Sequence, residues 1–212
     1  MELIKNKIIA EIGNNHLGDF SYFKEYVDKI IKLKIKYTTI QIREKEFYSS
    51  DNRKLILNST YIHDQFNRLK ESEINVGLAV ADTHFGKFTN NYIVDFYKIL
   101  SWKAEDYELI DFLLTFEKPI YISLGTLPGD RIIKLSERLG VHKNIKFIYT
   151  QLNYNVDDLN LNFLKSLKSK IEIPISYGHH AKNSIFPIIL SLSMEIDKIF
   201  IYLKLNDNNI FP

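Results

Sequence analysis

Short runs rich in β-branched residues alternate along the chain with longer segments of helical periodicity. The short runs are almost continuously apolar, which is typical of strands buried on both faces of a parallel sheet. The pattern predicts eight strands, at Ile8–Gly13, Thr38–Arg43, Asn75–Ala81, Val94–Leu100, Pro119–Leu124, Lys146–Gln151, Ile173–Tyr177 and Lys198–Leu203.

Amphipathic segments follow most of these strands. In the first of them, apolar residues recur every three or four positions, which is the spacing of one face of a helix. The predicted helices are Phe20–Leu33, Thr60–Glu71, Asp106–Phe116, Gly129–Leu139, Asp157–Lys168 and Pro187–Met194. The link His84–Tyr92, after the third strand, is short and only weakly helical in pattern.

This repeating strand–helix unit predicts an α/β fold, and specifically a (β/α)8 TIM barrel. An open doubly wound sheet is the alternative arrangement for the same pattern. The barrel is expected to be minimal, because only Asn206–Pro212 follows the eighth strand and a full eighth helix has no room there. No linker or change of composition divides the chain, so residues 1–212 are expected to form a single domain.

Composition excludes several classes of protein. Lys and Arg number 28 and Asp and Glu 26, a net charge of +2, so no excess of charge points to nucleic acid or to an anionic membrane as a partner. The absence of cysteine excludes disulfide scaffolds, thiolate metal sites and cysteine nucleophiles. No apolar run is long enough to span a membrane and no secretory signal is visible, so a cytoplasmic protein is expected.

Barrel enzymes carry their active sites on the loops that follow the strands, so polar residues within or just after the predicted strands are candidates for chemistry. Glu11 and Lys98 each lie within an apolar strand. A buried charge is costly unless it is paired or functional, so the two residues either form a structural ion pair or act on a substrate.

Two further groups follow later strands. Ser123 and the backbone of Leu124-Gly125 could bind a phosphate group through a hydroxyl and an amide. Adjacent His179 and His180 could include a metal ligand, although satisfied or exposed imidazoles are an equally good interpretation.

Four segments, taken in order, resemble the sialic acid synthase family, the NeuB-like synthases of N-acetylneuraminate, legionaminate and pseudaminate. They are Ile8–Gly18, which is similar to the family's I-A-E-I-G-x-N-H-x-G opening, then Tyr97–Ser101, Lys118–Gly125 and Ser176–His180. The resemblance extends over nearly the whole chain.

The resemblance implies a barrel followed by a small antifreeze-like domain. It implies an enzyme, a transferase that condenses phosphoenolpyruvate with an N-acyl amino-hexose to a nonulosonic acid in carbohydrate biosynthesis. A divalent metal, manganese or magnesium, is implied as cofactor, with His180 as a ligand. The implied catalytic residues are Glu11 and His16, and the implied substrate-binding residues are Asn15, Gln41, Lys98, Ser101, Ser123 and Tyr154.

Several positions depart from the family pattern. Thr39 stands where the family has a strand-two lysine. The position of the family's second metal-binding histidine corresponds to Ile201 or Tyr202 in this sequence. A site with one histidine would lose much of its metal affinity. The antifreeze-like domain is missing from the sequence, so a homodimer or a partner chain that supplies this domain is a possible arrangement.

Three hypotheses follow. The chain is a working but divergent synthase, or it is a catalytically degenerate barrel that serves as a binding or scaffold subunit. Alternatively, it is a metal-free enzyme of another kind, acting on a sugar or aldehyde with Glu11 and His179 or His180 as the acid–base pair.

Overall fold

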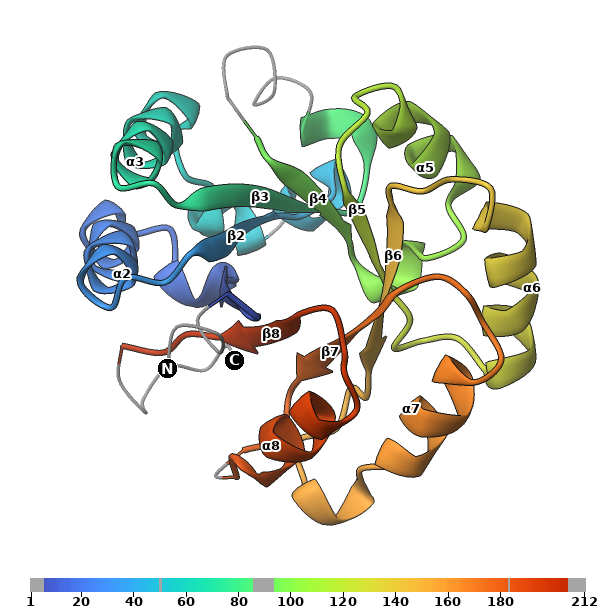
Figure 1. Ribbon diagram of the computed structural model, residues 1–212. Coiled ribbons are helices and arrows are strands. Elements are labelled where there is room, and N and C mark those ends of the chain that lie inside the picture. Colours follow the sequence, from blue (N-terminus) through green and yellow to red (C-terminus); the bar gives the residue numbers. More distant parts are fainter. Residues whose placement is uncertain (1–5, 50, 86–93, 183, 206–212) are drawn as a thin grey trace. The chain divides into compact units, whose positions relative to one another are not determined.

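The computed structural model describes residues 6–49, 51–85, 94–182 and 184–205. Its strands follow one another in the order β1 to β8 and close into a parallel barrel (Figure 1). The predicted (β/α)8 barrel is therefore confirmed and the open doubly wound sheet is wrong. The strands are β1 (Ile8–Ile12), β2 (Tyr37–Ile42), β3 (Asn75–Val80), β4 (Phe96–Ile99), β5 (Ile120–Ser123), β6 (Ile145–Thr150), β7 (Ile175–His179) and β8 (Ile199–Tyr202).

All eight predicted strands are present, with bounds displaced by no more than two residues. The helices are α2 (Phe20–Lys32), α3 (Ser59–Glu71), α5 (Tyr107–Leu114), α6 (Gly129–Leu139), α7 (Leu161–Lys168) and α8 (Phe186–Ser193). Short 3-10 turns are η1 (Asn14–His16), η2 (Lys45–Ser49), η3 (Asp51–Leu55), η4 (Thr83–Phe85), η5 (Ser101–Lys103) and η6 (Val156–Asp158). Most of the predicted link His84–Tyr92 and the segment Asn206–Pro212 lie outside the described residues.

One helix prediction is wrong at its start. The segment predicted as one helix from Asp157 is a 3-10 turn, η6, followed by α7 from Leu161. Leu159 is extended and interrupts the helix, and the Asn160 side chain accepts a hydrogen bond from the Phe163 N–H at 3.0 Å. Asn is a preferred N-cap residue, so this cap begins the helix four residues later than the periodicity alone indicated.

The chain divides into two compact units, residues 1–98 with 202–212 and residues 99–201. In the first unit, β1, β2 and β3 pair in parallel, and the register places Glu11 beside Thr39 and Thr39 beside Gly77. In the second, β5, β6, β7 and β8 pair in the same way, with Thr150 beside Gly178. Most apolar side chains of the strands are buried in both units.

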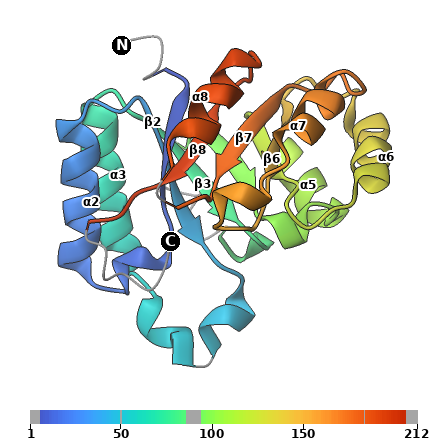
Figure 2. The ribbon, with the colours of Figure 1, turned by 90° about the horizontal axis from the view of Figure 1, so that it is seen from below.

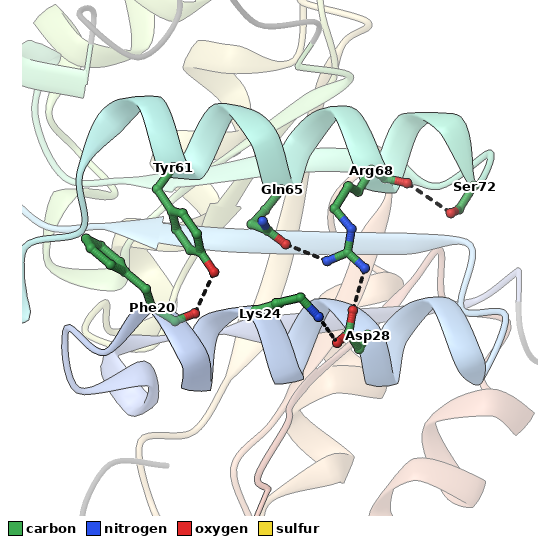
Figure 3. A network of polar contacts seen from close by, with 7 residues as sticks. All are labelled: Phe20, Lys24, Asp28, Tyr61, Gln65, Arg68 and Ser72. Carbon is green, nitrogen blue, oxygen red and sulfur yellow. Dashed lines mark hydrogen bonds and ion pairs between the residues drawn. The ribbon is translucent and has the colours of Figure 1, made fainter.

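In the first unit α2 and α3 lie side by side, as Figures 1 and 2 both show. The Asp19 side chain caps α2 by accepting from the Ser21 and Tyr22 N–H groups at 2.7 and 3.0 Å, and Asn58 caps α3. Polar contacts join the two helices (Figure 3): Asp28 of α2 accepts from Lys24 and from Arg68 of α3, and Arg68 also donates to Gln65 at 2.7 Å.

Replacing Asp28 with asparagine should lower the free energy of unfolding by about 1 kcal/mol or less at pH 7, because the side chain is 42% exposed. Burial raises the pKa of Asp28, but hydrogen bonds from Lys24 and Arg68 outweigh it and hold the pKa below its usual 3.8. The contribution is thus fully present above pH 3.8 and is lost as the pH falls through the lower folded-state pKa. Urea unfolding at pH 7 and pH 3 checks this, and a difference that grows in acid would contradict it.

Candidate active site

A buried ion pair joins two strands of the first unit. Lys98 of β4 donates to Oε1 of Glu11 of β1, and the two side chains are only 5% and 4% exposed. The register that sets Thr39 beside Glu11 also brings the Thr39 hydroxyl to 3.3 Å from the same oxygen, to which it donates. Of the two alternatives that the sequence left open for Glu11 and Lys98, the structure contains the ion pair. The pair keeps a carboxylate and an ammonium ion in a buried place where an isolated charge would be very costly.

Tyr202, at the end of β8, occupies the neighbourhood of this pair. The Lys98 Nζ lies 5.7 Å from the centre of the Tyr202 ring, close enough for a cation–π attraction. A Cβ added to Gly13 would come within 3.0 Å of the Tyr202 ring and 3.3 Å of the Gln41 amide oxygen. Glycine at position 13 therefore leaves room for both side chains.

The loop after β1 is buried and is held in place by hydrogen bonds. The Asn15 side chain donates to the backbone oxygen of Leu203, and the Leu203 N–H in turn donates to the Glu11 backbone oxygen at 3.1 Å. The loop thus links the chain after β8 to the strand that carries Glu11. The side-chain oxygen of Asn14 is buried without a hydrogen-bond partner among the described residues.

His16 ends this loop in a neutral state. Burial lowers its pKa to about 4, so the ring is uncharged at neutral pH. Its Nδ1 accepts from the Gly18 N–H at 2.9 Å, so the single proton of the neutral ring is on Nε2. Gly18 has a φ of +76°, and an added Cβ would lie 1.8 Å from the Lys54 backbone oxygen, so only glycine lets the η3 segment approach this closely.

His16 and Gln41 both line a cavity of about 270 Å³ between the end of β2 and the loop that carries η2 and η3. The η2 and η3 turns are the cyan segments at the bottom of Figure 2. The rest of the lining is formed by Ile40, Ile42, Lys45, Tyr48, Ser49, Leu55, Ile56, Leu57, Ile62 and His84. Sequence reasoning missed this cavity. The available signal was Leu55-Ile56-Leu57, an apolar run within an otherwise polar loop.

A chain of hydroxyl groups crosses three strand ends in the second unit. The Ser101 Oγ lies 2.8 Å from the Ser123 Oγ, which lies 3.2 Å from the Thr150 Oγ1, and all three residues are buried. Gly125 and Gly178 lie close by, since an added Cβ would come within 3.0 Å of the Ser101 Oγ and 2.3 Å of the Thr150 Oγ1, respectively. The structure therefore brings Ser101 and Ser123 together as the sequence grouped them.

Aromatic and basic side chains gather after β6 and β7 in the same unit. The rings of Tyr154 and His180 are 6.4 Å apart, and the Lys182 Nζ lies 4.6 Å from the centre of the Tyr154 ring. Burial lowers the pKa of His179, despite an opposing backbone hydrogen bond with Ser184, and its Nδ1 is 3.5 Å from the Tyr177 hydroxyl. The structure thus brings Tyr154 and His180 together.

These residues do not fit the divalent metal that the resemblance implies. Across the described residues, no group of three or more His, Cys, Asp or Glu side chains is arranged to hold a metal ion. His180 supplies one imidazole, whereas Ile201 has no donor atom and Tyr202 packs near Lys98.

Within the described part of the chain, no helix combines the length and the apolar character that crossing a membrane requires.

Two curated relatives match most of this chain at low sequence identity. A protein of Methanocaldococcus jannaschii of uncharacterized function is 27% identical over 213 residues, covering 95% of this chain and 63% of the relative. A pseudaminic acid synthase of Campylobacter jejuni is 23% identical over 207 residues, covering 86% of this chain and 60% of the relative. The chain thus spans about three fifths of the length of these relatives.

Solved structures agree on the fold. An N-acetylneuraminic acid (sialic acid) synthetase of Leptospira borgpetersenii has a TM-score of 0.83 at 22% identity, covering 94% of this chain and 73% of the other. A putative spore coat polysaccharide biosynthesis protein E of Chromobacterium violaceum has a TM-score of 0.83 at 16% identity, covering 95% and 67%. The sequence model of the NeuB family matches residues 23–192. Because this match takes in most of the chain, the protein belongs to the NeuB family.

Proposed function

We propose that this chain condenses phosphoenolpyruvate with the aldehyde form of an N-acylated amino-hexose, giving a nonulosonic acid and phosphate. Membership of the NeuB family supports this reaction class, as does similarity to a pseudaminic acid synthase and to a sialic acid synthetase. In this proposal residues 1–212 act as one catalytic domain.

The observation that carries the proposal is the buried Glu11–Lys98 pair. Fixed charges in a site that excludes water stabilise charge that develops during a reaction far better than the same charges in water. The Lys98 ammonium can donate to the anionic groups of phosphoenolpyruvate, and the Glu11 carboxylate can stabilise positive charge on its central carbon.

The bond changes balance without a further reactant besides water. The methylene carbon of phosphoenolpyruvate bonds to the aldehyde carbon, and the aldehyde oxygen takes a proton and becomes a hydroxyl. Water adds to the central carbon and gives up a proton, for which Glu11 is the proposed acceptor. The bond from that carbon to the phosphate oxygen then breaks, the hydroxyl that came from water loses its proton and becomes the keto oxygen, and phosphate leaves with that proton.

The remaining predicted residues have proposed binding roles. Ser101 and Ser123 would donate to the phosphoenolpyruvate oxygens through their buried hydroxyls. Asn15, Gln41 and Tyr154 would contact the sugar, and neutral His16 would donate from Nε2 rather than act as a base.

Phosphate release from phosphoenolpyruvate, measured with a panel of N-acylated hexosamines with and without manganese, tests the proposal. We expect release that depends on the sugar, and a fall in kcat of roughly 10²- to 10⁴-fold in Glu11→Gln, the range typical of losing a general acid or base. Glu25→Gln, on the exposed face of α2, is the matched control and should keep wild-type activity. Absence of release across the whole panel would reject the enzyme.

One observation favours the alternative of a binding or scaffold subunit. Glu11 is already neutralised by Lys98 and receives a hydrogen bond from Thr39, so the site is satisfied without a substrate. A wild-type protein that binds an N-acylated amino sugar but releases no phosphate would support this alternative.

A further inference from the structure

The cavity beside β2 has two kinds of wall. Its aliphatic wall consists of Ile40, Ile42, Leu55, Leu57 and Ile62, each at most 5% exposed. A water molecule occupies about 30 Å³ of liquid, so a cavity of about 270 Å³ has room for a group of several heavy atoms. An alkyl chain that packs against this wall would remove apolar surface from water, and this burial would stabilise the bound ligand.

The other wall carries two hydrogen-bond donors that are uncharged at neutral pH, His16 and Tyr48, and the cationic Lys45 also lines the cavity. His16 is 3% exposed and presents its Nε2–H as the remaining polar group of its ring. The Tyr48 hydroxyl accepts from the Arg43 N–H at 3.1 Å, which leaves its own proton to donate. Among the residues that line the cavity, none is an Asp or Glu. This wall therefore suits an acceptor such as an amide carbonyl oxygen.

Gln41 connects the cavity to the buried ion pair. Side chains two positions apart on a strand point to the same face, so Gln41 shares a face of β2 with Thr39. Thr39 donates to Glu11, and Gln41 lines the cavity. The rise of about 3.3 Å per residue sets these two positions roughly 7 Å apart along the strand. A substrate that reacts beside Glu11 could therefore extend a substituent past Gln41 into the cavity.

From these features we propose that the cavity receives the N-acyl substituent of the amino-hexose. The carbonyl oxygen accepts from His16 and Tyr48, and the alkyl chain packs against Leu55, Leu57 and Ile62. This inference rests on the proposed function for the identity of the sugar, and it makes the β2 loop the part of the chain that selects the acyl group.

Calorimetric titration of the full chain without phosphoenolpyruvate tests the inference. The probes are mannosamine and its N-acetyl, N-propanoyl and N-butanoyl derivatives. We expect affinity to rise about three- to fourfold for each added methylene, the factor that corresponds to about 0.8 kcal/mol per buried CH2. Mannosamine itself should bind more than tenfold more weakly than its N-butanoyl derivative. Affinities that do not depend on the acyl chain, or no binding by any acylated probe, would overturn the inference.

Two variants locate the binding. Leu57→Trp fills the cavity and should abolish the dependence on chain length, while Ile189→Trp, at a 54% exposed position of α8, is the matched control. Tyr48→Phe removes one donor with little change of volume and should weaken all three acylated probes about equally. Thermal melting shows whether Leu57→Trp folds. If it does not fold, the affinity of Tyr48→Phe for the acylated probes tests the inference alone. Wild-type affinity in folded Leu57→Trp or in Tyr48→Phe would contradict the inference.

The outcome is separable from that of the proposed function. Selective binding of longer acyl chains without phosphate release would uphold the acyl cavity and reject the synthase. Phosphate release, combined with affinities that do not change with the acyl chain, would uphold the synthase and reject the acyl cavity. Tight binding of free butanoate, with no gain from the attached sugar, would show a carboxylate site instead and would also count against the inference.

Discussion

Replacing Lys98 with methionine should destabilise the folded protein by about 3–5 kcal/mol, the range found when one partner of a buried ion pair is removed. The reason is the burial of Glu11, which is 3% exposed and, among the described residues, would keep the hydrogen bond from Thr39 without a charged partner. Urea unfolding of the two proteins at pH 7 measures the difference. Lys70→Met is the matched control, because Lys70 pairs with Asp95 at a position where its side chain is 31% exposed, and it should cost about 1 kcal/mol or less.

A double variant separates two contributions to this loss of stability: the lost attraction between Glu11 and Lys98, and the cost of leaving the Glu11 charge buried without a partner. Glu11→Leu/Lys98→Met removes both charges, and we expect it to be clearly more stable than Lys98→Met, because apolar side chains can replace a buried pair at little cost. The coupling energy of the cycle would then be large, as expected for residues in direct contact. A double variant as unstable as the sum of both single variants would show that the two charges do not depend on each other.

Stability should fall steeply as the pH drops from 6.5 toward 4 because of His16. Burial lowers the pKa of His16 from 6.5 to about 4, so in this window the unfolded chain binds a proton that the folded chain does not. Each pH unit can cost up to about 1.36 kcal/mol per proton, which gives a total on the order of 3 kcal/mol at pH 4. Above pH 6.5 both states are neutral at this residue and His16 adds no pH dependence.

The measurement is the free energy of unfolding against pH for wild type and His16→Phe. The variant keeps an aromatic ring against Phe23, whose centre lies 5.8 Å from that of His16, but it cannot be protonated. It should therefore lose the part of the slope between pH 6.5 and 4 that His16 contributes. Identical slopes in wild type and His16→Phe would mean that His16 is not the group responsible.

The barrel was predictable because short, nearly continuous apolar runs alternate with amphipathic segments, which is the pattern of parallel strands covered by helices. The start of α7 was not, because the Asn160 cap and the extended Leu159 are local features that override helical periodicity. The Glu11–Lys98 pair could be inferred because two charges within apolar strands must be satisfied by something nearby.

The cavity was not predictable in the same way. Its aliphatic wall combines β2, the η3 segment and α3, and no single stretch of sequence shows that these face one another. The close approach of η3 to the loop after β1 depends on Gly18, because a methyl group at this position would collide with the Lys54 backbone. From sequence alone, Gly18 is one more glycine after a strand. The role of Tyr202 near Lys98 likewise depends on barrel closure, which brings the last strand beside the first.

The hydroxyl chain of Ser101, Ser123 and Thr150 can reverse the direction of its hydrogen bonds. Three hydroxyl protons serve only two hydrogen bonds among these residues, so one proton is left over at an end of the chain. Each O–H bond can rotate, so the chain can run in either direction, and the spare proton is at Thr150 in one direction and at Ser101 in the other. An oxyanion arriving at either end would select one direction and align all three dipoles toward itself. The positions of the three oxygens therefore leave open the direction in which these hydrogen bonds run.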